Sequence, residues 1–287
     1  MTALTIAQQL SQQKTAIAFS SGFFGFYHHA GALKAIIEQG ITPLKVSGTS
    51  AGSIVAALYA AGLPPDDICD ALLTIKRRDF WDFSFPFTRN GFGWLKGERF
   101  KNLMDTLLPV HDFADCKIPL SVGVYTIDDG RSRQLSSGDI TAAVRASSAV
   151  PYLFQPIKIN NRIYWDGGFA EKTPLGNFVN DPDIDSVIIC HMPPREERNG
   201  KKPKSGIFSG LKFFADTPLE ERIKRDQVAV NLLRQAGKEV VILAPERIWL
   251  GPFTLDKAKE AMDFGYTETL KLLESTDNKV LGCSELK

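Results

Sequence analysis

Apolar residues along this chain gather in short runs that alternate with segments of helical periodicity. The run at Thr15–Phe19 predicts a buried strand, and residues 31–38 repeat apolar positions at helical spacing before Gly40, a glycine typical of a helix C-terminus. A second short apolar run leads to Gly48, and residues 54–61 then continue as an uninterrupted helix-like run. This order of strand, helix, strand and helix at compact spacing predicts a parallel sheet covered by helices.

The remainder of the chain keeps the same alternation. A helix starts at residues 64–67, where prolines stand at the entry and acids in the first turn. The other predicted helices cover 98–108, 140–148, 218–236 and 255–274, the strands cover 119–127, 186–190 and 239–243, and the hairpins turn at 128–130 and 160–161. A charged stretch at 195–204 is interpreted as a solvated loop. Because there is no internal repeat or low-complexity segment, we expect residues 1–287 to form one α/β domain.

Residues 80–94 interrupt this alternation, because seven of these fifteen residues are aromatic. The aromatic residues are Phe80, Trp81, Phe83, Phe85, Phe87, Phe92 and Trp94. The prolines and glycines between them fit neither helical nor strand periodicity. Two interpretations remain open: a loop that packs its rings onto the core, or an apolar lid or acyl-chain wall beside a functional site.

Composition narrows the classes of protein to which the chain can belong. The formal net charge is +1, so composition alone gives no reason to expect nucleic-acid binding. The four cysteines lie far apart without a C-x-x-C spacing, which favours reduced thiols over a zinc site or a disulfide framework. The N-terminus lacks the pattern of a signal peptide, and the longest apolar run, 54–63, is too short for a transmembrane segment. We therefore expect a cytoplasmic protein, although an effector exported without a cleaved signal has the same features.

The strongest chemical motif is the G-x-S-x-G pattern from Gly48 to Gly52, with Ser50 at its centre. The pattern also occurs by chance, so its setting matters. A predicted strand leads in and a predicted helix leads out, as in a nucleophile elbow, where a strained turn exposes the serine hydroxyl. Glycines on either side keep side chains away where the strand and the helix come close. The sequence therefore predicts Ser50 as a nucleophile.

A serine nucleophile needs a base, and two candidates stand at the ends of predicted strands. Asp166 is followed by Gly167 and Gly168, which allow a sharp turn of the backbone. His191 follows the predicted strand at 186–190 and is one of four histidines in the chain. The chain order serine, aspartate, histidine is also that of a triad on an α/β-hydrolase scaffold, so both candidates stay open at this point.

A glycine-bearing loop at residues 20–25 lies between the first predicted strand and the first predicted helix. Its backbone amides, together with the helix dipole, can converge on a developing oxyanion. A phosphate-binding loop is the alternative, but two glycines of a dinucleotide fingerprint and the Walker lysine are absent. We therefore predict that the loop stabilises an oxyanion.

Taken together, four blocks of the chain resemble the patatin-like phospholipases, a family of acyl hydrolases. The blocks are residues 22–34, 48–52, 146–154 and 166–168, in the family's order within residues 15–176. The resemblance implies a three-layer α/β/α sandwich with a mostly parallel central sheet. It also implies a dyad without histidine, with Ser50 as nucleophile and Asp166 as base, and a reaction that needs no metal or other cofactor. Further site positions follow from it: Gly22, Phe23, Phe24 and Gly25 in the oxyanion hole, and Gly48, Gly52, Gly167 and Gly168 as motif glycines.

The chain departs from the family pattern in the oxyanion loop. The family usually begins this loop with several glycines and often carries a basic residue, whereas this chain has Ser20 and Ser21 at the start and Phe23 and Phe24 further on. The stretch 26–31 is similar to the animal triglyceride-lipase branch, with one residue more. Because backbone amides supply the oxyanion donors, the loop can keep its role despite these changes. The last 110 or so residues carry no part of the resemblance.

These observations predict a serine acyl hydrolase of the lipase or phospholipase A type, which cleaves lipid esters through an acyl-Ser50 intermediate. Its partners would be the lipid or acyl-ester substrate and, by peripheral contact, a membrane surface; we expect no nucleic-acid partner. Two alternatives remain: an inactive lipid-binding or scaffold protein with the same fold, and a triad esterase that uses Ser50, Asp166 and His191. The altered oxyanion loop motivates the first alternative, and the position of His191 motivates the second.

Overall fold

A mixed eight-stranded sheet forms the centre of the computed structural model, which describes residues 4–193 and 219–276. Its strands are β1 (Thr15–Phe19), β2 (Lys45–Thr49), β5 (Leu120–Thr126), β6 (Arg131–Leu135), β8 (Ile157–Ile159), β9 (Arg162–Asp166), β10 (Ser186–Cys190) and β11 (Glu239–Leu243). They follow the order β11-β10-β1-β2-β5-β9-β8, and β6 pairs with β5. The first five strands in this order run parallel, whereas β6, β8 and β9 pair in antiparallel fashion. The sheet is therefore mostly parallel, as predicted.

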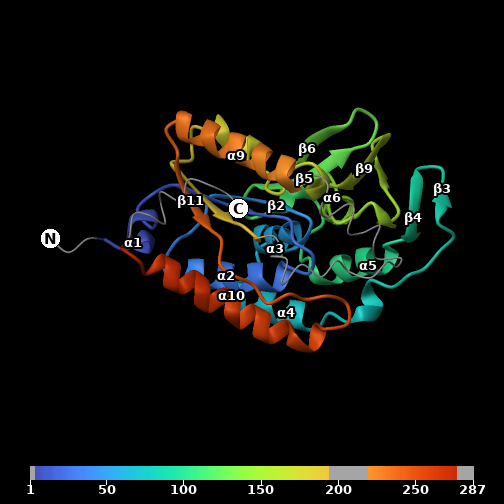
Figure 1. Ribbon diagram of the computed structural model, residues 1–287, viewed down its shortest axis with the longest axis horizontal. Helices are drawn as coiled ribbons and strands as arrows, with labels where there is room; N and C mark the ends of the chain where they lie inside the picture. Colours follow the sequence, from blue (N-terminus) through green and yellow to red (C-terminus); the bar gives the residue numbers. More distant parts are fainter. Residues whose placement is uncertain (1–3, 194–218, 277–287) are drawn as a thin grey trace.

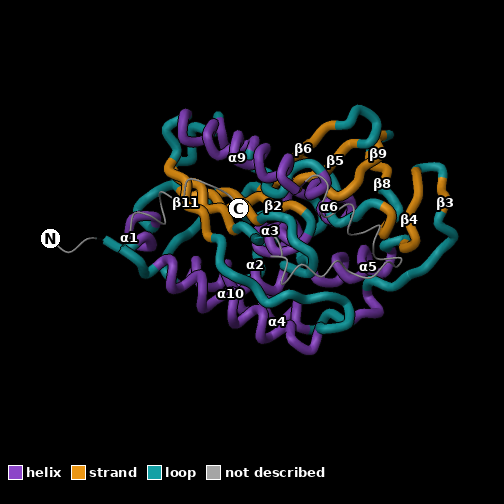
Figure 2. The backbone as a smooth tube through the Cα atoms, viewed as in Figure 1, coloured by secondary structure: helices purple, strands orange, loops and turns teal. Residues whose placement is uncertain are grey.

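Helices cover both faces of this sheet (Figures 1 and 2). They are α1 (Ile6–Leu10), α2 (Phe26–Glu38), α3 (Ala51–Ala60), α4 (Pro65–Leu73), α5 (Glu98–Leu107), α6 (Ile140–Ser147), α7 (Gly176–Val179), α9 (Leu219–Gln235) and α10 (Ala258–Leu273). Alternate residues of β1 belong to two separate cores: Ile17 and Phe19 pack with α2 and α3, and Ala18 packs with α7 and α9. Strands buried on both faces carry the continuous apolar runs seen in the sequence. The predicted three-layer α/β/α sandwich is confirmed.

Helices α2 and α10 pack closely along one face of the sheet (Figure 1). A Cβ atom on Gly31 of α2 would lie 2.1 Å from the carbonyl oxygen of Met262 in α10. A Cβ atom on Gly265 of α10 would lie 2.6 Å from the carbonyl oxygen of His28. Both glycines are needed because the two backbones approach to van der Waals contact. The predicted helix at 31–38 starts earlier than expected, since α2 already begins at Phe26, directly after the glycine-bearing loop.

The aromatic segment differs from its prediction. It contains a short hairpin of β3 (Phe87–Thr88) and β4 (Gly91–Leu95), where no strand periodicity was seen, and β4 pairs with β7 (Tyr152–Phe154) in a separate three-stranded sheet. The sequence shows no alternation of polar and apolar side chains here because positions 91 and 93 are glycines. Gly91 has φ +139°, and the backbone of residues 154–155 lies 2.3 Å from where a Cβ of Gly93 would be, so both positions favour glycine. Short 3₁₀ turns occur at Arg77–Asp79, Phe113–Asp115, Gly167–Phe169 and Leu255–Lys257.

The other predicted elements lie close to their expected bounds. The turn at Asn160 and Asn161 joins β8 to β9, and both residues have the positive φ of a tight hairpin, 47° and 65°. The last predicted helix is divided, since the Leu255–Lys257 turn precedes α10. The stretch 195–204, predicted as a loop, and Cys283 lie outside the described residues.

Candidate active site

Ser50 occupies a sharp turn between the carboxyl end of β2 and the start of α3. Its backbone has φ 53° and ψ −121°, a strained conformation for a residue with a side chain. A Cβ atom on Gly48 would lie 2.3 Å from the carbonyl oxygen of Gly52, and a Cβ atom on Gly52 would lie 2.4 Å from the carbonyl oxygen of Phe19. The strand and helix can meet only because these two positions are glycine. The local geometry is therefore that of the predicted nucleophile elbow.

Asp166, at the end of β9, lies directly against this turn. The Ser50 hydroxyl donates a hydrogen bond to Asp166 Oδ2 at 2.7 Å, and the Gly168 amide donates to Asp166 Oδ1 at 2.7 Å. Antiparallel pairing of β9 with β5, which is parallel to β2, brings together residues that are 116 positions apart. Gly167 sits against β5, where an added Cβ atom would lie 2.4 Å from the carbonyl oxygen of Gly123.

Burial changes the acidity of this carboxyl group. Asp166 is only 5% exposed, and burial raises its pKa from 3.8 to about 6. The hydrogen bonds from Ser50 and Gly168 and the positive charge of Arg222 oppose this rise because they stabilise the carboxylate. A carboxylate with a raised pKa that accepts a hydrogen bond from a serine is a competent general base near neutral pH.

A second serine, Ser147 of α6, fixes the backbone of the elbow. Its hydroxyl accepts a hydrogen bond from the Ser50 amide at 2.8 Å and donates one to the Gly123 carbonyl at 2.6 Å. From within α3, the Ser53 hydroxyl donates to the Ser50 carbonyl at 2.6 Å. Ser147 lies within the motif block at residues 146–154, where the sequence assigns it no role. The available signal was a hydroxyl inside an otherwise apolar, buried helix face.

The glycine-bearing loop runs beside Ser50 and carries amides with free donor capacity. The Gly25 amide is already engaged, because it donates to the Gly22 carbonyl at 2.7 Å. Within the described part of the chain, the amides of Gly22, Phe23 and Phe24 have no hydrogen-bond acceptor. Phe24 has φ 51°, so this tight turn aims successive amides differently from a helix. The candidate oxyanion donors therefore narrow to these three positions, joined by the amide of Ala51, the residue after the serine.

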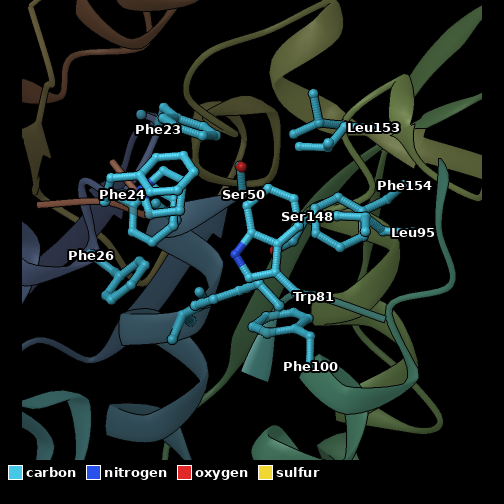
Figure 3. A pocket seen from close by; sticks show the side chains of 17 residues that line it. Phe23, Phe24, Phe26, Ser50, Trp81, Leu95, Phe100, Ser148, Leu153 and Phe154 are labelled. Atoms are coloured by element: carbon cyan, nitrogen blue, oxygen red, sulfur yellow. The ribbon is translucent and has the colours of Figure 1, made fainter. Parts of the chain in front are cut away.

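Ser50 lies at one wall of a cavity of about 360 Å³ (Figure 3). The wall is apolar apart from two serine hydroxyls and backbone groups. Lining residues are Gly22, Phe23, Phe24, Phe26, Ser50, Ala51, Ile54, Phe80, Trp81, Leu95, Phe100, Ser148, Val150, Leu153, Phe154, Pro252 and Phe253. Phe80 and Trp81 thus line the cavity, whereas the rest of the aromatic segment lies outside it or is exposed. The cavity suits an apolar ligand such as an acyl chain.

His191 lies in a different network. It is buried, and its Nε2 is 3.4 Å from Lys172 Nζ, which donates a hydrogen bond to the Met192 carbonyl at 2.5 Å. The structure therefore brings together Ser50 and Asp166, and it places His191 beside a lysine. Burial lowers the pKa of this lysine, while the nearby carboxylate of Asp226 opposes the shift.

Helix α9 holds the segment that follows Asp166. The Arg222 guanidinium donates to the Gly168 carbonyl at 2.6 Å. One turn further on, the Asp226 carboxylate accepts hydrogen bonds from the Lys172 amide at 3.1 Å and the Thr173 hydroxyl at 2.8 Å. Sequence reasoning missed these contacts because α9 lies about 55 residues beyond the motif it supports. A run of charged residues on a helix carries no signal that distinguishes them from a solvated face.

Two histidines of α2 contact backbone: His29 contacts the glycine-bearing loop, and His28 contacts the segment that follows β11. His29 Nε2 lies 2.8 Å from the Ser20 carbonyl, and His28 Nε2 accepts a hydrogen bond from the Ile248 amide at 3.0 Å. Burial lowers the pKa of His28 to about 4 and that of His29 to about 3. Both imidazoles are therefore neutral near pH 7, and they position backbone rather than transfer protons.

This elbow, carboxylate and loop lie within a recognised family domain. The patatin-like phospholipase family model matches residues 17–179. The chain belongs to the patatin-like phospholipase family. An uncharacterized NTE family protein of Mycobacterium tuberculosis is 26% identical over 165 residues, which cover 58% of this chain and 45% of that protein. The uncharacterized protein YqhO of Bacillus subtilis is 24% identical over 271 residues, which cover 84% of this chain and 91% of YqhO.

A solved structure supports the same fold assignment. VipD of Legionella pneumophila superposes with a TM-score of 0.54 and 14% sequence identity, over 92% of this chain and 67% of VipD. At this identity the likeness concerns the fold alone. The matched segment spans less than half the length of the mycobacterial relative, so it does not carry over that protein's properties.

The described residues contain neither a cluster of metal-ligating side chains nor a membrane-spanning helix. Within residues 4–193 and 219–276, no group of three or more histidine, cysteine, aspartate or glutamate side chains is placed to hold a metal ion. Within the same ranges, no helix is both long and apolar enough to cross a membrane.

Proposed function

We propose that this protein is a serine acyl hydrolase of the phospholipase A type, which cleaves lipid esters with a serine–aspartate dyad. The observation that carries the proposal is the 2.7 Å hydrogen bond from Ser50 to the buried carboxylate of Asp166, at the wall of an apolar cavity. Family membership supports lipid ester hydrolysis in general, and the dyad chemistry is our inference from the geometry.

The reaction divides into acylation and deacylation. Ser50 Oγ attacks the ester carbonyl carbon while Asp166 takes the hydroxyl proton, and the carbonyl oxygen becomes an oxyanion beside the amides of Gly22, Phe23 and Phe24. Collapse of this intermediate breaks the ester bond, and the departing alcohol takes the proton from Asp166. Water then attacks the acyl-Ser50 carbonyl with Asp166 again as base, which releases the fatty acid and restores the serine.

Geometry favours the dyad over a triad that includes His191. Asp166 already uses one carboxylate oxygen for the Ser50 hydroxyl and the other for the Gly168 amide. His191 Nε2 instead lies 3.4 Å from Lys172 Nζ, and it is Asp166 that accepts the hydrogen bond from the Ser50 hydroxyl.

The apolar cavity favours an acyl ester as substrate and contact with a membrane as the source of that ester. A cavity of about 360 Å³ falls within the usual range for ligand sites and accommodates an extended acyl chain. Cys69, Cys116 and Cys190 are free thiols, in keeping with the reducing cytoplasm as the place of action.

A fluorophosphonate probe tests this proposal against the inert-scaffold alternative. The probe should label the wild-type protein on Ser50 and leave Ser50→Ala unlabelled, and Ser50→Ala should lose hydrolysis of p-nitrophenyl butyrate. The matched control is Ser137→Ala, an exposed serine after β6 that does not line the cavity, which should retain labelling. A wild-type protein that reacts with neither probe nor ester would identify a scaffold and contradict the proposal.

A further inference from the structure

The β3–β4 hairpin and the residues that lead into it from Phe83 carry aromatic side chains outward. Phe83, Phe85, Phe87 and Trp94 are 69%, 74%, 66% and 47% exposed. Figure 1 shows this hairpin projecting beyond the central sheet at the edge of the molecule. Rings in this segment touch each other in sequence, with centroid distances of 5.8 Å for Phe85 and Phe87, 5.2 Å for Phe87 and Phe92, and 5.7 Å for Phe92 and Trp94. A contiguous exposed apolar surface of this kind marks an interaction site.

This aromatic surface is continuous with the mouth of the cavity that holds Ser50. Phe83 stacks on Trp81 at 5.3 Å with an interplanar angle of 19°, and Trp81 lies 6.3 Å from the ring of Phe253. Trp81 and Phe253 both line the cavity, and Phe253 is itself 65% exposed. Aromatic rings therefore connect Phe83 to the wall of the cavity that Ser50 lines.

Positive charge surrounds the exposed rings. Residues 76–99 contain six lysines and arginines but three acids, although the whole chain has a net charge of only +1. The basic residues are Lys76, Arg77, Arg78, Arg89, Lys96 and Arg99, and all six are exposed.

The three acids of this stretch are engaged within the protein. Asp79 accepts a hydrogen bond from the Lys76 amide, and Asp82 accepts from the amides of Gly97 and Arg99. Glu98 forms an ion pair with Arg145 of α6 at 2.9 Å. Arg77 extends its guanidinium over the ring of Phe253, 5.2 Å from the centroid, which places a positive charge at the mouth of the cavity. The surface therefore presents apolar rings within a positive rim.

We propose that the β3–β4 hairpin and its basic rim are the membrane-docking surface of this protein, and that the surface fits a bilayer rich in anionic lipids. Phenylalanine and tryptophan rings insert at the boundary of headgroups and acyl chains, and arginines bind lipid phosphates and anionic headgroups. A bilayer fits better than a protein partner because the rings project from a narrow hairpin at the mouth of an acyl-sized cavity. The role of this docking surface in delivering a lipid ester to Ser50 rests on the proposed function. Binding to vesicles, in contrast, does not require hydrolysis.

Vesicle co-sedimentation of the Ser50→Ala chain tests the proposal without lipid hydrolysis. We expect binding to vesicles of phosphatidylglycerol mixed with phosphatidylcholine and weak binding to phosphatidylcholine alone. Phe85→Ser/Phe87→Ser should lower the partition coefficient roughly tenfold or more, since both rings lose their insertion into the bilayer. The matched control is Val228→Ser/Leu232→Ser, which removes two exposed apolar side chains, 58% and 45% exposed, from α9. Equal loss in the hairpin and control variants, or no loss in either, would overturn the proposal.

Charge reversal provides a second variant that does not touch the rings. Arg78→Glu/Arg89→Glu changes two exposed side chains and should abolish the preference for anionic vesicles. Salt near 1 M, where the screening length falls to ~3 Å, should have the same effect on the unsubstituted chain. Brominated acyl chains should quench the fluorescence of Trp94, and Trp94→Phe should remove that quenching. Binding that ignores both charge reversal and salt would overturn the anionic preference.

Hydrolysis of a water-soluble ester separates failure of docking from failure of the proposed function. None of Phe85, Phe87 and Arg89 lines the cavity, so their variants should hydrolyse p-nitrophenyl butyrate at the wild-type rate. Hairpin-dependent binding to vesicles without any esterase activity would retain the docking surface and refute the proposed function. Esterase activity together with vesicle binding that does not depend on the hairpin would retain the proposed function and refute the docking surface. A hairpin-dependent dimer in sedimentation velocity without vesicle binding would identify a second copy of the chain as the partner and refute the bilayer.

Discussion

One hydrogen bond, from Ser50 Oγ to Asp166 Oδ2, connects the proposed nucleophile, which has a strained backbone, to a buried carboxylate. Both groups are held by further hydrogen bonds. The Ser147 hydroxyl accepts from the Ser50 amide, and the Gly168 amide donates to the second carboxylate oxygen of Asp166. The serine needs this support because its φ of 53° is unfavourable without it.

The first prediction at the residue scale compares the two candidate bases. Asp166→Asn should lower kcat by at least ~10³-fold, because the amide cannot take the hydroxyl proton. His191→Ala should cost less than ~10-fold, below the usual effect of losing a general base. Activity of the wild-type protein should decrease at pH values below about 6, the pKa of Asp166, because the base is then protonated. Initial rates with p-nitrophenyl butyrate, with folding checked by circular dichroism, provide the measurement; the reverse ranking would identify a triad hydrolase.

A second residue-scale prediction concerns stability. Burial raises the pKa of Asp166 from 3.8 to about 6, so the folded protein binds this proton more tightly than the unfolded chain. The favourable contribution is therefore complete below about pH 4 and is lost as pH rises through about 6. Asp166→Asn removes the buried charge and should raise the free energy of unfolding by ~1–3 kcal/mol at pH 8 and by little at pH 4.

Urea unfolding of the wild type and of Asp166→Asn at both pH values checks this difference. Ser147→Ala, which removes a buried hydroxyl but no charge, is the control whose effect should not depend on pH. A stability gain for Asp166→Asn that is equal at pH 4 and pH 8 would show that ionisation of Asp166 is not its cause.

At the scale of elements, α9 contacts the segment after Asp166, the proposed base, from outside the family match, which ends at residue 179. Arg222 bonds to the Gly168 carbonyl and, by its charge, lowers the pKa of Asp166. Arg222→Ala should therefore shift the acid limb of the pH–rate profile of kcat/KM to higher pH, and Arg222→Lys should retain much of the wild-type limb. Arg225→Ala, an exposed arginine on the same helix, is the matched control. A uniform loss of activity at every pH would indicate a purely structural role for Arg222.

The aromatic segment is divided between two roles. Trp81 lines the cavity, whereas Phe85 is exposed on the hairpin. Trp81→Ser should therefore raise KM for monomeric long-chain p-nitrophenyl esters several-fold more than for butyrate, because only a long chain reaches this ring. Phe85→Ser should leave both KM values unchanged below the critical micelle concentration. Parallel changes for both esters would assign Trp81 to packing alone.

At the scale of the molecule, the central sheet and the close packing of α2 against α10 position the candidate active site. We interpret residues 1–287 as one domain because β10 and β11, beyond the family match, pair into the same sheet as β1 and β2. Helix α10 likewise packs on α2, the helix that follows the glycine-bearing loop.

Gly31 provides the test of this arrangement. Gly31→Ala places a methyl group 2.1 Å from the Met262 carbonyl oxygen, so α2 and α10 must separate. We expect a loss of about 1–3 kcal/mol in the free energy of unfolding, the usual range for overpacking. Gly251→Ala, where a Cβ atom meets nothing within 4 Å, is the control and should be nearly neutral in urea unfolding. Equal stability of the two variants would show that the helices can adjust at no cost.

The sequence by itself predicted the elements and the candidate reactive residues. Apolar runs and glycine stops predicted β1, β2, β10, β11 and most helices, since strands and helices are encoded in neighbouring residues. The G-x-S-x-G pattern located Ser50, because an elbow is built within five residues. Asp166 was found through a pattern shared with a family, together with its two following glycines.

Only the tertiary structure decided which distant groups meet. Ser147, Arg222 and Lys172 acquire their roles from strand order and helix docking, which bring together residues far apart in the chain and leave no local pattern. The hairpin at residues 87–95 was missed because its two glycines replace the side chains that would have shown alternation. Whether its rings face the core or solvent depends on what packs against them, and that is set by the three-dimensional arrangement of the whole chain.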